Sequence, residues 1–156
     1  MMRIFVALLL MFSLACQAGE ESAAIFEISA DKPMDEIYQN LYKSLEDSGF
    51  YVIFEANIGK NLEKNAERWG EDYNRNKFES VRSMVICNPN YSNQLLNLDP
   101  KMMALCPMNV TLLHKQGKTT VLFERLMPNA AGSPAQDILW EMENGIISAI
   151  EAVIGE

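Results

Sequence analysis

The chain has 156 residues, of which 49% are hydrophobic and 22% are charged. This length predicts one domain, because a chain of roughly 150 residues can bury about two thirds of its unfolded surface. The formal net charge of −8 argues against nucleic-acid binding, which needs a basic surface. A single histidine argues against a His-rich zinc site and against a His-based catalytic triad.

The amino terminus has the pattern of an export signal. Arg3 precedes an uncharged apolar run over residues 4–15. This run is shorter than the about 20 residues of a membrane-spanning helix and has the length of a signal-peptide core. We therefore expect residues 1–18 to be a signal peptide and residues 20–156 to form a single domain.

Cys16 permits a second interpretation of the same segment. The order Leu14-Ala15-Cys16 resembles the end of a bacterial lipoprotein signal, in which the cysteine becomes the lipidated first residue. We expect an exported protein of the periplasm, or one anchored in the envelope if Cys16 carries lipid. No other apolar run approaches membrane length, so the mature chain is predicted to have no transmembrane segment.

The remaining sequence predicts alternating strands and helices. The first half contains a strand over 24–29, a helix capped by Asp31 that ends at 47–49, and a strand over 50–56. A short helix before Gly70 and a strand over 78–87 follow. The second half contains a short helix over 92–98 after Asn88-Pro89, a hairpin of 108–114 and 119–125, and a helix over 134–154. The hairpin and the short connections favour an antiparallel sheet with helices packed on one face, which is an α+β fold.

The last helix has the clearest signature. Ser133 and Gln136 have the spacing of a capping box. Its predicted buried face comprises Ile138, Met142, Ile146, Ala149, Ile150 and Val153.

Cys87 and Cys106 predict one structural disulfide, because two thiols in an oxidising compartment pair readily. Closing a loop of this length stabilises a fold by roughly 3 kcal/mol. A domain of this size can fold without such a bond, so free thiols, ligand-binding thiols and a redox-active pair stay open as alternatives. The spacing is not that of a CxxC motif.

Sulfur side chains gather just before the hairpin. Met102, Met103 and Met108 accompany Cys106, and soft sulfur ligands suit Cu(I). His114 falls on the same strand face as Met108. A Cu(I) or haem site built from these residues and Cys87 is one hypothesis. The ordinary role of methionine is to fill irregular gaps in a core.

Aromatic residues suggest a third kind of site. Trp69 and Tyr73 lie in the irregular polar segment 57–77, where an aromatic side chain has little core to join. They are candidates for a lid over a pocket that holds a small apolar ligand between the sheet and the last helix.

The ordered set of turns between the third strand and the hairpin resembles a known family. Cys87-Asn88-Pro89, a Leu-rich helix that ends in Asp99-Pro100, and Cys106-Pro107 resemble the domain of unknown function 302 family, in which the last pair is more often Pro-Cys. Ser48-Gly49-Phe50 before a strand also matches. The resemblance implies a curved antiparallel sheet of the TATA-binding-protein class with a long C-terminal helix across it, often in a dimer, and no established activity.

The combined prediction is an exported, non-catalytic domain that binds a small ligand or a partner and needs no cofactor. A soft-metal or haem protein and a thiol-redox enzyme of the envelope are the alternatives. No phosphate-binding loop, metalloprotease motif or nucleophile elbow occurs in the sequence.

Overall fold

The computed structural model describes residues 24–155, so the predicted signal peptide and Cys16 lie outside the described residues. The strands are β1 Ile25–Ala30, β2 Tyr51–Asn57, β3 Ser80–Cys87, β4 Met108–Lys115 and β5 Lys118–Glu124. The helices are α1 Met34–Asp47, α2 Ile58–Glu63, α3 Ala66–Trp69, α4 Pro89–Leu98 and α5 Gln136–Ile154, with short 3₁₀ helices η1 Gly70–Asp72, η2 Pro100–Leu105 and η3 Met127–Asn129.

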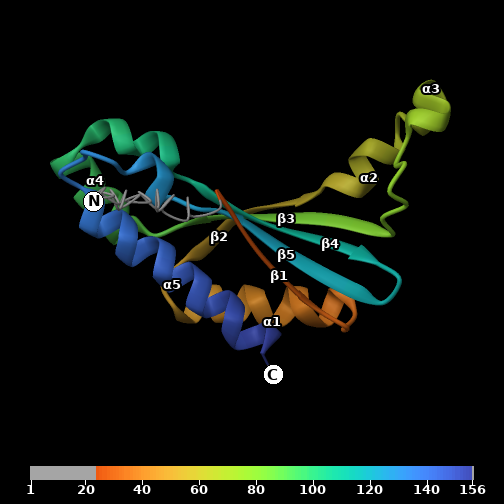
Figure 1. Cartoon of the computed structure of the whole chain (residues 1–156), viewed down its shortest axis with the longest axis horizontal. Coiled ribbons are helices and arrows are strands. Elements are labelled where there is room, and N and C mark those ends of the chain that lie inside the picture. The colour runs from red at the N-terminus through yellow and green to blue at the C-terminus, as the bar shows by residue number, and fades with distance from the viewer. Residues whose placement is uncertain (1–23, 156) are drawn as a thin grey trace, which may run out of the picture.

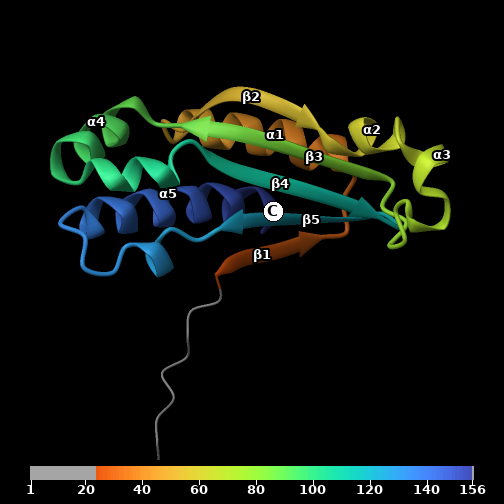
Figure 2. The ribbon, with the colours of Figure 1, turned by 90° about the horizontal axis from the view of Figure 1, so that it is seen from above.

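The five strands form one antiparallel sheet in the order β1-β5-β4-β3-β2 (Figure 2). The β4–β5 hairpin turns through Gln116 and Gly117, which have φ angles of 53° and 76°. Two successive residues with positive φ match a two-residue turn whose twist suits a hairpin. This arrangement confirms the predicted single α+β domain.

The two long helices, α1 and α5, pack side by side on one face of the sheet (Figure 1). Their apolar stripes and the alternate side chains of the strands form the core, because successive strand residues point to opposite faces. Fully buried members include Ile37 and Leu41 of α1, Met84 of β3 and Ile146 of α5. No helix within residues 24–155 is both long and apolar enough to cross a bilayer.

The buried face of α5 differs from its prediction at three positions. Leu139 is buried, whereas Ile138 is only partly buried. Glu143 is buried beside Met142, a charged residue that an apolar stripe cannot reveal. The other predicted members, from Met142 to Val153, are in the core.

Several helix ends also differ from prediction. Helix α1 begins after Pro33 with no side-chain cap, so Asp31 does not cap it. Helix α4 begins at Pro89 with Asn88 as its cap, as the Asn88-Pro89 pair predicts, and so starts three residues before the predicted range 92–98. The Asn88 side chain accepts hydrogen bonds from the N–H groups of Asn90 and Tyr91. Segment 57–77 contains α2, α3 and η1 instead of one short helix.

Candidate functional site

The sheet face opposite α1 and α5, here called the open face, has short helices at its two ends. Helices α2 and α3 rise at one end, between β2 and β3, and α4 lies at the other (Figure 1). Each end carries a candidate functional site. A cavity lies beside α2, and a pair of thiols lies beside α4. The two are separated by the length of β3, roughly 26 Å for its 8 residues of strand.

The cavity beside α2, here called the ligand cavity, has a volume of about 360 Å³. This is within the range of small-molecule sites, about 300–1,000 Å³. Its walls come from α2, the loop before β3 and the start of β3, and both apolar and polar groups face it. The lining residues are Asn57, Gly59, Lys60, Leu62, Glu63, Tyr73, Asn74, Phe78, Glu79, Ser80 and Val81.

Local hydrogen bonds hold these walls in place. The Asn57 side chain accepts from the Lys60 N–H at 2.9 Å and so caps α2. Across the cavity, Asn74 accepts from the Phe78 N–H at 2.9 Å and donates to the Phe78 carbonyl at 2.8 Å. The start of α2 is therefore tied to the end of β2, and Asn74 closes the loop before β3 on itself.

Gly59 permits the close approach of α2 to β3. A Cβ at this position would lie 3.2 Å from the Val81 backbone nitrogen, which is tighter than ordinary packing allows. Any larger residue would push α2 away from β3 and open the cavity on that side.

A shallower groove of about 420 Å³ adjoins the ligand cavity on the open face and shares Phe78 with it. The groove runs toward β1 and is lined by Leu113 and by charged residues of both signs, among them Lys115, Lys118, Glu27 and Asp31. Phe78 is thus the side chain common to both hollows.

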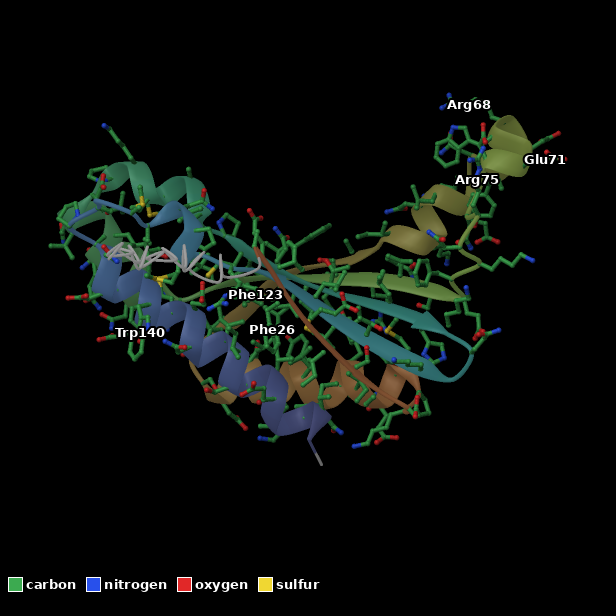
Figure 3. The ribbon with its side chains drawn as sticks, in the orientation of Figure 1. Phe26, Arg68, Glu71, Arg75, Phe123 and Trp140 are labelled. Carbon is green, nitrogen blue, oxygen red and sulfur yellow. The ribbon has the colours of Figure 1, made fainter. Side chains whose placement is uncertain are left out.

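The two predicted lid aromatics have different positions. Tyr73 lines the ligand cavity, whereas Trp69 does not, and this cavity is lined by no residue of α5, unlike the predicted pocket between the sheet and the last helix. Trp69 lies at the tip of the α2–α3 segment, where the Arg68 guanidinium is 5.7 Å from the centre of its ring. Figure 3 shows Arg68, Glu71 and Arg75 at this tip, well away from the sheet.

The thiols of Cys87 and Cys106 form what we call the thiol cluster with Ser92. The two Sγ atoms are 4.0 Å apart, and the Ser92 Oγ lies 3.4 Å from the first and 3.3 Å from the second. Both cysteines are free and half-buried here, so the predicted disulfide stays a prediction. Burial raises the pKa of the Cys106 thiol, which disfavours its nucleophilic thiolate form.

The predicted methionine ligands take part in core packing. Met102 and Met103 are partly buried against the core, and Met108 is buried in it. His114 is far from the thiol cluster, because it pairs with Ser80 at one end of β3 whereas Met108 pairs with Ile86 at the other.

His114 has local partners instead. Its Nδ1 is 2.9 Å from the Thr119 Oγ1, and its Nε2 is 3.8 Å from the Glu79 carboxylate. Among residues 24–155, no three His, Cys, Asp or Glu side chains are grouped closely enough to hold a metal ion.

Sequence reasoning missed Ser92 and most of the ligand cavity. Ser92 is four residues after Asn88, a spacing that places it one helical turn beyond the cap. Leu62, Asn74 and Val81 carry no comparable signal, because the approach of α2 to β3 is a tertiary contact.

The sheet, with one face covered by α1 and α5 and a cavity on its open face, defines a small single-domain α+β protein. The family model described as "Domain of unknown function DUF302" matches residues 26–153, and the chain belongs to this family.

A solved structure has the same fold. It is the crystal structure of an uncharacterized conserved protein DUF302 from Bacillus stearothermophilus, 17% identical in sequence, with a TM-score of 0.72 over 83% of this chain and 98% of that one. No curated protein matches the sequence.

Proposed function

We propose that this protein is a non-catalytic binding domain that takes a small ligand with an apolar body into the ligand cavity. The observation that carries the proposal is the cavity itself, in which Leu62, Tyr73, Phe78 and Val81 offer apolar contact. Polar side chains at its rim, such as Lys60 and Asn74, can orient a polar substituent. Polar and apolar groups share the lining about equally, so the cavity suits an amphipathic ligand better than a wholly apolar one.

Titration with 8-anilinonaphthalene-1-sulfonate, an amphipathic aromatic sulfonate that fluoresces in apolar surroundings, tests the proposal. Leu62→Ala removes part of the cavity wall and should weaken binding about tenfold, the effect of losing roughly two buried methylene groups. Leu96→Ala in α4 is the matched control, since Leu62 and Leu96 are 42% and 52% exposed. Equal affinities of the two variants would contradict the proposal.

Export belongs to the same proposal and rests on the apolar run over residues 4–15. The mass of the protein recovered from bacteria that express it distinguishes the two forms of export. Loss of residues 1–18 indicates a periplasmic product, and a lipid on Cys16 indicates an envelope anchor. Recovery of the intact chain from the cytoplasm would contradict both.

A homodimer is consistent with the edge strand β2. Tyr51, Ile53 and Phe54 are exposed on it, and an edge strand presents unpaired backbone groups to a second strand. Antiparallel pairing of β2 with its copy about a twofold axis would cover these side chains.

The thiol cluster supports a second candidate function, which is chemistry at the Cys87 and Cys106 thiols. The 4.0 Å between the Cys87 and Cys106 sulfurs supports exchange between them or a shared soft ion such as Cu(I). Haem receives less support, because His114 is at the far end of β4. A redox enzyme with fast turnover receives less support than a pair that equilibrates slowly, because burial raises the pKa of the Cys106 thiol and disfavours its thiolate.

A further inference from the structure

The thiol cluster lies outside the ligand cavity and has an arrangement that the binding function does not require. The Ser92 hydroxyl donates its one proton to the Asn88 carbonyl at 2.9 Å. Its two lone pairs then face the two sulfurs, at 3.4 and 3.3 Å. Since a hydroxyl has one donor and two acceptor sites, both thiols can donate to Ser92 at once.

In this arrangement Ser92 can accept a hydrogen bond from each of the two protonated thiols. A disulfide has no S–H group to donate, so Ser92 would lose both hydrogen bonds on oxidation. The reduced pair is therefore stabilised specifically by Ser92, and the stabilisation is lost when the sulfurs join.

The polar groups in contact with the sulfurs are neutral, and neutral surroundings favour disulfide formation over metal binding at these cysteines. Each sulfur is in contact with the other and with the Ser92 hydroxyl. Two thiolates on a soft ion would bring negative charge to a half-buried position, at a cost in desolvation. The dithiol and the disulfide are both uncharged.

We propose that Cys87 and Cys106 are a reversible dithiol–disulfide pair that exchanges with the disulfides of small thiols, and that Ser92 sets its equilibrium. One cysteine thiolate attacks a sulfur of R–S–S–R, forms a mixed disulfide and releases one RS⁻, which takes up the proton that the attacking thiol lost. The second cysteine then attacks the protein sulfur of that mixed disulfide and releases the second RSH. The two cysteines are oxidised by two electrons in total, and one R–S–S–R is reduced to two RSH. The sulfurs move from 4.0 Å to the roughly 2 Å of a disulfide.

Equilibration of the full chain with graded ratios of reduced and oxidised glutathione tests the pair. Every sample carries Cys16→Ser, so that Cys87 and Cys106 are the only thiols. After acid quenching and alkylation, mass spectrometry counts the free thiols. We expect a single two-electron transition that is the same in both directions. Stable glutathione adducts on separate cysteines, or a bond that stays oxidised in the most reducing buffer, would overturn the proposal.

Ser92→Ala tests the role of the hydroxyl. Loss of two hydrogen bonds to the reduced state should raise the equilibrium constant for oxidation about tenfold, a shift of about 30 mV toward negative potential for a two-electron couple. Ser92→Thr keeps the hydroxyl and should resemble the parent. Ser48→Ala is the matched control, because Ser48 also donates to a carbonyl four residues earlier, that of Ser44. Equal constants for Ser92→Ala and Ser48→Ala would overturn the assignment of Ser92.

Discussion

Glu143 of α5 and Arg125, which follows β5, form an ion pair that fastens the long helix to the sheet. One carboxylate oxygen accepts from the Arg125 Nε at 2.8 Å and Nη2 at 2.5 Å. The other accepts from the backbone N–H groups of Leu126 and Met127, at 2.6 and 2.9 Å. Glu143 is only 1% exposed, so these four bonds compensate a buried charge.

Glu143→Ala should lower the free energy of unfolding by about 3–5 kcal/mol, because it removes one partner of a buried pair and leaves two backbone donors unsatisfied. Urea unfolding monitored by circular dichroism measures the change. Glu151→Ala on the exposed side of the same helix should change stability by less than about 0.5 kcal/mol. A similar loss in both variants would contradict the role given to Glu143.

Tyr38 should ionise at unusually high pH. Burial, and then its 2.6 Å hydrogen bond to the Glu55 carboxylate, raise the pKa of its phenol to about 12. The absorbance of phenolate, taken as the difference between the parent and Tyr38→Phe, isolates this titration. A difference curve centred near 10, the ordinary value for tyrosine, would contradict the described environment.

The same shift predicts a pH dependence of stability. Between about pH 10 and 12 the folded protein keeps the Tyr38 proton while the unfolded chain loses it. The stabilisation is therefore complete below pH 10 and is lost as the pH rises through 12. Urea unfolding at pH 9 and pH 11 should show a larger decrease for the parent than for Tyr38→Phe.

Ile53→Lys should abolish self-association through β2. Ile53 is 58% exposed at the irregularity in the pairing of β2 with β3, and a charge on an edge strand opposes further pairing. Light scattering on the parent and the variant measures the mass in solution. Trp140→Lys, an exposed position on α5, is the control and should leave the mass unchanged. A parent that is monomeric at high concentration would contradict the proposed dimer.

The fold could be predicted because most of its helices and strands have recognisable local sequence patterns. The hairpin has turn residues between two alternating strands, and α4 has an Asn cap followed by proline. The order of these elements, together with the cysteine turns, was enough to identify the family. Pairing of distant strands, such as β1 with β5, then follows from closing one antiparallel sheet.

The site was harder to predict because its residues meet only in the folded chain. Tyr73 stood out as an aromatic in a polar segment, yet Trp69 gave the same signal and lies at the exposed tip of that segment. His114 and Met108 share a strand face, but six residues of strand separate them. Alternation predicts which face a residue lies on and does not predict how close two residues on that face are. The burial of Glu143 could not be predicted because its partner Arg125 lies after β5, outside helix α5.

The most direct test of the central claim, that the ligand cavity binds small molecules, is an amide chemical-shift titration with 8-anilinonaphthalene-1-sulfonate. We expect shifts concentrated in residues 57–63 and 73–81, which form the cavity walls. Trp140, which Figure 3 shows on α5 at the opposite end from the tip of the α2–α3 segment, should not respond. Shifts that cluster around Trp140 or α4, or no saturable shifts at all, would contradict the claim.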